Sequence, residues 1–123
     1  MSAETAANTL LKYRDSLVRW GEESEIGIGR AVKRANKLFE QNHEYFKALR
    51  ESPEGRKGIT ALTDDENPYV RATAAGHSLL WAPEIAIRVL EEMEGDERTP
   101  WRMQISAEYT LKEWRSGDLS FDW

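Results

Sequence analysis

Four prolines divide the second half of the chain at nearly regular intervals. Pro53, Pro68, Pro83 and Pro100 are separated by 15, 15 and 17 residues. Proline is favoured at the first position of a helix, because its ring fixes a helical φ and its missing N–H would have no intrahelical partner there. The spacing therefore predicts short helices joined by tight turns, which is typical of stacked helical hairpins.

The residues around these prolines are typical of helix starts. Ser52, Asn67 and Thr99 directly precede three of the prolines, and their side chains are good N-caps. Glu54 and Glu84 follow two of them, where the helix dipole favours negative charge. We therefore expect a helix to begin at each proline.

Apolar residues recur at helical spacing along the whole chain, and no stretch shows convincing alternation. We expect about six helices, over residues 6–20, 24–49, 53–63, 68–81, 83–94 and 100–115. Gly21 is expected to end the first helix and Ser24 to open the second, with a kink or break near Asn42. A short strand is left open only for residues 119–123. The predicted fold class is all-α, a short HEAT-like stack of antiparallel helical hairpins in one domain, residues 1–123.

Two sets of apolar residues bear on the core and on binding. The stripe of the last expected helix comprises Trp101, Ile105, Tyr109 and Trp114, with Ala107 and Leu111 beside them. Trp20 and Trp114 fit apolar stripes and are expected in the core. Trp101 and Trp123 are expected to be partly exposed anchors for a partner.

Composition limits the class of protein. The 123 residues suit one domain, and the absence of cysteine excludes disulfides and thiolate metal sites. No apolar run approaches the ~20 residues of a membrane span, and the N-terminus lacks the pattern of a signal peptide. We expect a cytoplasmic protein that does not bind membranes.

Charge is unevenly distributed between the two halves. Residues 1–60 carry a net charge of +2 and residues 61–123 a net charge of −7. The acidic half disfavours binding to a phosphate backbone and favours a basic partner, although acidic residues also simply keep proteins soluble.

An internal repeat appears when Pro68 is aligned with Pro100, 32 residues later. The alignment also pairs three further positions: Tyr69 with Trp101, Ala75 with Ala107, and Leu79 with Leu111. Two helices in such an interval match the size of a helical solenoid repeat. A small residue at the repeated alanine position allows a neighbouring helix to approach closely.

Residues 62–79 resemble a HEAT-type helical repeat. The matching features are an acidic turn, Asn67, Pro68, Val70, Arg71, Ala74, Ala75 and Leu79. The resemblance implies that Arg71 binds an acidic or backbone group of the turn, with Asp64 or Asp65 at the matching positions. Asn67, Pro68 and Arg71 are therefore expected to have structural roles. In the second copy Met103 aligns with Arg71, which departs from the family pattern.

Three segments resemble, more closely, a small bacterial family of uncharacterised helical proteins. They are residues 67–71 (NPYVR), 82–84 (APE) and 106–114 (SAEYTLKEW). Members of that family look like immunity proteins of polymorphic-toxin or contact-dependent inhibition systems. The resemblance implies a protein that binds and neutralises a cognate toxin.

The sequence offers little for catalysis or for a cofactor. His43 is expected to face solvent or to lie in a helix break, and His77 to border the core as a structural residue. Gly27 and Gly29 lack the preceding strand and third glycine of a nucleotide-binding loop. The acidic turn 64–66 lacks the spacing of a calcium loop. We expect no catalytic residue, no metal site, no cofactor and no enzymatic activity.

Acidic residues are the main candidates for partner binding. A run near the end of the fifth expected helix opposes the helix dipole, so helix stability alone does not favour it. The candidate partner-binding residues are Asp64, Asp65, Glu66, Glu91, Glu92, Glu94, Asp96, Glu97 and Trp101. The expected partner is a basic toxin domain, for example a nuclease whose cleft the acidic residues cover. The alternative function is a general HEAT-like scaffold or regulatory adaptor. The acidic run itself can also be a solvated turn without function.

A third hypothesis is nucleic-acid binding. Its residues would be the basic side chains of the second expected helix and one neighbour: Arg30, Lys33, Arg34, Lys37 and Arg19. Because these residues interleave with apolar positions, they also fit the solvated face of an amphipathic helix, which is the favoured interpretation.

Overall fold

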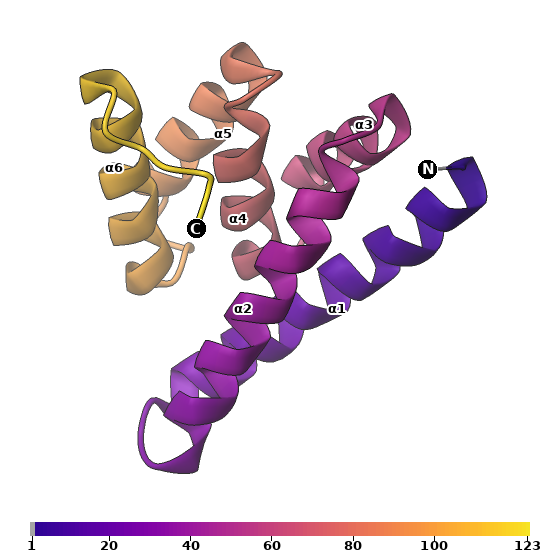
Figure 1. Cartoon of the computed structure of the whole chain (residues 1–123). Coiled ribbons are helices and arrows are strands. Elements are labelled where there is room, and N and C mark those ends of the chain that lie inside the picture. Colours follow the sequence, from indigo (N-terminus) through magenta and orange to yellow (C-terminus); the bar gives the residue numbers. More distant parts are fainter. Residues whose placement is uncertain (1) are drawn as a thin grey trace. The chain divides into compact units, whose positions relative to one another are not determined.

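A computed structural model describes residues 2–123 and contains six α-helices and one short 3₁₀ helix in that range, with no strand. The elements are α1 (Ala3–Ile26), α2 (Arg30–Leu49), α3 (Pro53–Ala61), η1 (Leu62–Asp64), α4 (Pro68–Ser78), α5 (Pro83–Gly95) and α6 (Trp101–Ser116) (Figure 1). The prediction of an all-α protein with about six helices is confirmed. None of the helices in the described range is long and apolar enough to cross a membrane.

The chain divides into two compact units, with the boundary inside α3. Unit 1 extends to Ile59, and unit 2 comprises Thr60–Trp123. The expectation of a single domain over residues 1–123 stays a prediction.

Unit 1 is built on an antiparallel hairpin of α1 and α2 (Figure 1). Both helices bury an apolar face, whose largest members are Tyr13, Leu17, Phe46 and Leu49. Burial of this size of side chain contributes about 2 kcal/mol each and is the main stabilising term of such a pair. Complete burial also raises the pKa of the Tyr13 phenol well above its ordinary value.

The turn between α1 and α2 differs from the sequence-based expectation. Gly21 does not end the first helix but is a buried residue inside α1. The helix ends at Gly27, whose positive φ of 66° is the left-handed conformation that glycine adopts at low cost. Ser24 consequently belongs to α1, and α2 begins after Gly29.

The expected kink near Asn42 is absent from α2, which is continuous from Arg30 to Leu49. Asn42 is buried against α1, and its hydrogen bonds to that helix explain how an amide fits into the apolar face of α2. Its Nδ2 donates to the carbonyl oxygen of Tyr13 at 3.1 Å and to Ser16 Oγ at 3.0 Å. A buried amide costs little free energy when it is hydrogen-bonded in this way. His43, expected at the surface, is buried as well.

Unit 2 contains α4, α5 and α6, and α4 contacts both of the others. Four apolar residues of the HEAT-like motif, Val70, Ala74, Ala75 and the following Leu79, are fully buried. From α5, the buried side chains are Ala86, Val89, Leu90 and Met93. Small residues bring α4 close to α6, and a Cβ at Gly76 would lie 3.7 Å from Thr110 Cγ2.

The proline rhythm predicts most helix starts correctly. Pro53, Pro68 and Pro83 are the first residues of α3, α4 and α5, whereas Pro100 is the N-cap of α6. Thr99 is therefore not the N-cap, in contrast to the prediction. Thr99 lies one residue before this N-cap and is buried.

The buried face of α6 is not the predicted aromatic stripe. The helix buries Met103, Ala107 and Leu111, and Trp114 is only half-buried. Trp101 is exposed, as expected, with 66% of its surface accessible, and Ile105 and Tyr109 are exposed as well, with 41% and 58% accessible. Small buried residues on both helices, such as Ala107 on α6 and Ala75 on α4, are compatible with the contact between α4 and α6.

The internal repeat is partly reflected in burial. Ala75 and Ala107 are both buried, as are Leu79 and Leu111. The aromatic pair differs, because Tyr69 is buried whereas its counterpart on α6 is exposed.

Candidate functional site

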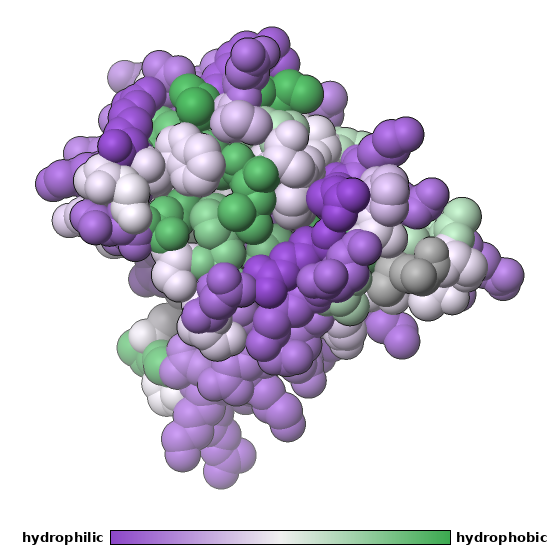
Figure 2. Space-filling view, turned by 45° about the horizontal axis from the view of Figure 1, so that its top comes forward, coloured by the Kyte–Doolittle hydropathy of each residue, from purple (hydrophilic) through white to green (hydrophobic). Residues whose placement is uncertain are grey.

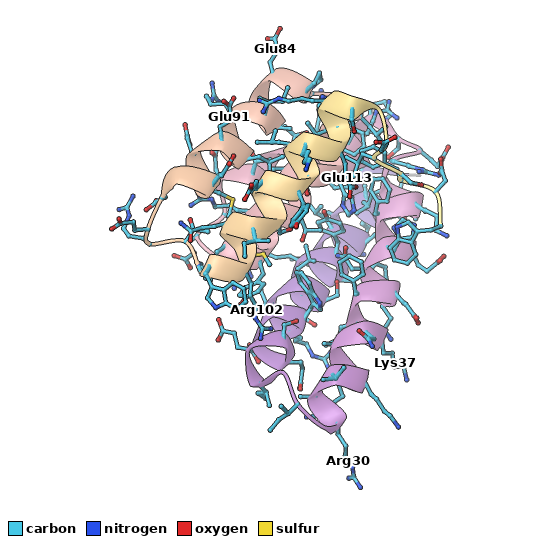
Figure 3. The ribbon with its side chains drawn as sticks, turned by 90° about the vertical axis from the view of Figure 1, so that its left-hand side faces the viewer. Arg30, Lys37, Glu84, Glu91, Arg102 and Glu113 are labelled. Carbon is cyan, nitrogen blue, oxygen red and sulfur yellow. The ribbon has the colours of Figure 1, made fainter. Side chains whose placement is uncertain are left out.

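The candidate acidic residues lie at three places in unit 2. These places are the turn 64–66, the C-terminal half of α5, and the loop 96–99 between α5 and α6. Glu84 and Glu91 of α5 and Glu113 of α6 are labelled in Figure 3. Two of these places, the turn and α5, contribute carboxylates to one polar hollow.

The turn 64–66 combines structural and exposed carboxylates. Asp65 is half-buried, and its Oδ1 accepts a hydrogen bond of 2.9 Å from the backbone N–H of Asn67. Oδ1 of Asn67 in turn accepts from the N–H groups of Tyr69 and Val70, which caps α4. Asp65 thus shapes the turn, whereas Asp64 and Glu66 are exposed to solvent.

A polar hollow of about 170 Å³ lies between this turn, α4 and α5. It is lined by Thr63, Asp64, Arg71, Val89 and Glu92. The fold thereby brings together two predicted partner-binding carboxylates and the arginine of the HEAT-like motif. With one arginine and two carboxylates, the lining of the hollow has a formal net charge of −1.

The carboxylates of α5 point to different sides of the helix. Glu91, Glu92 and Glu94 are all exposed, and the last turn of α5 contains no basic residue. Glu91 Oε2 lies 3.9 Å from Nη2 of Arg115 on α6, with both side chains 57% exposed. An exposed pair at this distance contributes at most about 1 kcal/mol, so Glu91 stays available to a partner.

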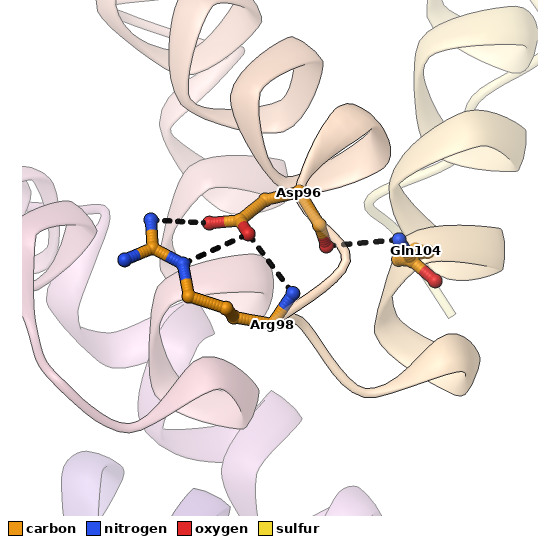
Figure 4. A network of polar contacts seen from close by, with 3 residues as sticks. All are labelled: Asp96, Arg98 and Gln104. Carbon is orange, nitrogen blue, oxygen red and sulfur yellow. Dashed lines mark hydrogen bonds and ion pairs between the residues drawn. The ribbon is translucent and has the colours of Figure 1, made fainter.

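Asp96 is engaged within its own loop (Figure 4). Its carboxylate accepts hydrogen bonds from the backbone N–H, Nε and Nη2 of Arg98, at 2.9, 3.1 and 3.0 Å. Its carbonyl oxygen accepts from Nε2 of Gln104 on α6 at 2.9 Å. Of the acidic loop residues, Glu97 is the exposed one and Asp96 is partly neutralised by its neighbour.

The contact between Asp96 and Arg98 should be detectable in the titration of the Asp96 carboxyl group. Hydrogen bonds from the Arg98 side chain and backbone lower the pKa of the Asp96 carboxyl, and the pKa of Arg98 is raised in return. Because the folded-state pKa of Asp96 is depressed, its stabilising effect is present above the ordinary carboxyl pKa and is lost as pH falls through the folded value.

We expect carboxyl NMR to show Asp96 titrating below an ordinary aspartate, and Arg98→Ala to return its midpoint towards the ordinary value. Arg88→Ala, which removes another exposed arginine of unit 2, serves as the control. An Asp96 midpoint that does not move in Arg98→Ala would contradict this assignment.

The basic residues of unit 1 are partly paired. Arg34 Nε lies 3.0 Å from Glu23 Oε2, and Arg19 Nη1 lies 3.7 Å from Asp15 Oδ2. Arg30 and Lys37 extend from the ribbon of α2 (Figure 3). This mixture of paired and solvated cations fits the favoured interpretation of a solvated helix face.

Within residues 2–123, no group of three or more His, Asp or Glu side chains is arranged to hold a metal ion. His77 is half-buried in the last turn of α4.

Sequence reasoning missed three features of this surface. It did not predict the pairing of Arg98 with Asp96, although an i,i+2 aspartate–arginine pair flanking an acidic run is a recognisable signal. It did not place Glu92 beside Asp64, because these residues are distant in sequence. Nor did it predict that Ile105 and Tyr109 are exposed together.

The comparisons with known proteins support the fold. No family model matches the chain, and no curated protein matches it at a significant level. The fold is similar to that of the protein RPA1889 from Rhodopseudomonas palustris CGA009, with a TM-score of 0.78 and 22% sequence identity. The alignment covers 94% of this chain and 92% of that one. At this identity the similarity establishes a shared all-helical fold.

Proposed function

We propose that the chain is a binding protein that recognises a basic surface of a protein partner through the carboxylates of unit 2. In its specific form, the partner is a bacterial toxin and the complex blocks the toxin's activity, as the resemblance to immunity proteins implies. The carboxylates proposed to contact the partner are Asp64, Glu66, Glu91, Glu92, Glu94 and Glu97.

The observation that carries this proposal is the exposed carboxylate set at the C-terminal end of α5. Glu92 and Glu94 lie where the helix dipole is negative, and the last turn of α5 offers no basic residue to compensate. Each unfavourable charge of this kind costs about 0.3–1 kcal/mol of helix stability. Residues kept at such a cost are candidates for a role outside folding.

Electrostatics supports the same proposal at longer range. Residues 61–123 carry a net charge of −7. A field of this sign accelerates encounter with a cationic surface, and it becomes weaker as salt screens it. The polar hollow adds a shallow site where a lysine or arginine of the partner can lie between Asp64 and Glu92.

The proposal is tested by co-expression with the product of the adjacent gene. We expect that product to arrest growth when expressed alone, and this chain to restore growth and to co-purify with it. The alternative function, a scaffold or regulatory adaptor with a different partner, predicts no adjacent toxin gene and no rescue of growth. A toxic neighbour that is neither bound nor neutralised would contradict the toxin assignment.

A further inference from the structure

The outer face of α6 carries three apolar side chains that the core of unit 2 does not use. Trp101, Ile105 and Tyr109 are spaced four residues apart, and all three are exposed. Since each residue advances by about 100° around a helix, Ile105 lies about 160° away from the buried Ala107. The apolar stripe is therefore almost opposite the face that packs on the core.

We propose that this stripe, Trp101–Ile105–Tyr109, is the apolar centre of the partner-binding surface, and that its occupant is a basic protein segment with an apolar face. This inference rests on the proposed function and adds to it. The carboxylates would attract the partner, and the stripe would supply most of the apolar contact area.

The residue types of the stripe fit this role. Tryptophan and tyrosine are enriched among the residues that dominate binding energy at protein interfaces, because they bury a large area at a low cost in conformational entropy. The guanidinium of Arg102 lies 5.6 Å from the ring centroid of Trp101, a cation–π geometry that holds the ring in place. Figure 2 shows that apolar side chains (green) are exposed among hydrophilic ones on the molecular surface.

Charge decides which occupant is favoured. α6 itself has three basic and two acidic residues, a net charge of +1, and one of the basic residues, Arg115, is paired with Glu91 of α5. The charges of the helix alone therefore do not favour a basic occupant. The acidic residues of α5 and of the following loop set the sign, because Glu97 precedes Trp101 by only four residues and lies exposed. With the net charge of −7 over residues 61–123, this arrangement favours a cationic segment.

The test uses two synthetic peptides of leucine and lysine with the same composition. In one peptide the leucines form a single helical face, and in the other their order is permuted so that no face exists. Fluorescence anisotropy of the labelled peptides measures binding to the wild-type chain and to two variants. The first variant is Trp101→Ser/Ile105→Ser/Tyr109→Ser, and its matched control is Leu80→Ser/Ile85→Ser, which alters exposed apolar residues elsewhere in unit 2.

We expect the amphipathic peptide to bind the wild-type chain at least about tenfold more tightly than the permuted peptide. The stripe variant should lose this preference, the control should keep it, and circular dichroism should show the same helix content in all three proteins. Equal binding by the stripe variant, or equal binding of the two peptides, would overturn the inference.

Self-association provides a separate check on the occupant. We expect the wild-type chain to sediment as a monomer at the concentrations used. A dimer that forms in the wild-type chain but not in the stripe variant would show that a second copy, not a basic partner, covers the stripe.

If growth rescue fails while the peptide preference holds, the toxin assignment is wrong and the stripe remains a docking site. If rescue succeeds without that preference, only the stripe assignment is wrong.

Discussion

Gly55→Ala is expected to lower the free energy of unfolding by about 3 kcal/mol. Gly55 lies buried in the first turn of α3, where its N–H donates to Ser52 Oγ at 3.0 Å. A Cβ at this position would overlap the carbonyl oxygen of Leu49 and lie 2.7 Å from its carbonyl carbon. These are backbone atoms at the end of α2, so α3 must move as a whole to relieve the overlap.

Two other glycines serve as controls for this substitution. At Gly95 a Cβ meets nothing within 4 Å, so Gly95→Ala should stabilise the protein by up to about 1 kcal/mol. At Gly58 the Cβ meets Cδ2 of Leu10 at 2.7 Å, and this flexible side chain can move aside. Urea denaturation should therefore rank Gly95→Ala above the wild type, then Gly58→Ala, then Gly55→Ala. A Gly55→Ala protein as stable as the wild type would show that α3 does not pack as described.

Simultaneous replacement of Glu91, Glu92 and Glu94 by lysine is expected to weaken the complex with the partner by more than about tenfold. Each reversal replaces an attractive charge by a repulsive one at an exposed position of α5. Isothermal titration calorimetry with the purified partner measures the change. The folded state should persist, because the ion pair between Glu91 and Arg115 is long and exposed.

A reversal of equal size in unit 1 separates the local contact from net charge. Glu4, Glu22 and Glu40 are exposed and belong to α1 and α2. Their conversion to lysine changes the total charge by the same amount and should alter affinity by no more than about threefold. An equal loss in both triple variants would mean that only the overall charge matters and that α5 is not the contact surface.

Helix starts could be predicted from the sequence because they depend on local chemistry. A proline at the first turn and an asparagine cap act within a few residues, and both are visible in the sequence around Pro68. Helix ends were less predictable. Gly21 and Gly27 carry the same local signal, and only the packing of α1 against α2 decides that the former is a buried helical residue.

The faces of α6 show a second limit of sequence reasoning. Periodicity shows that Trp101, Ile105 and Tyr109 share a face, but it cannot show which face the rest of the unit covers. The choice depends on α4 and α5, which contact α6 and cover Met103, Ala107 and Leu111 instead. The hollow beside Arg71 could not be predicted for the same reason. Its carboxylates come from η1 and α5, which only the fold brings together.

The most direct test of the central claim is the association rate constant with the purified partner, measured by stopped flow over a range of salt concentrations. For the wild-type chain we predict a rate that falls steeply as salt rises, because carboxylates of unit 2 attract a basic surface. The Glu91/Glu92/Glu94 reversal should associate more slowly and with a flatter salt dependence. A wild-type rate that does not respond to salt, or a reversal variant that associates as fast as the wild type, would contradict the proposed role of these residues.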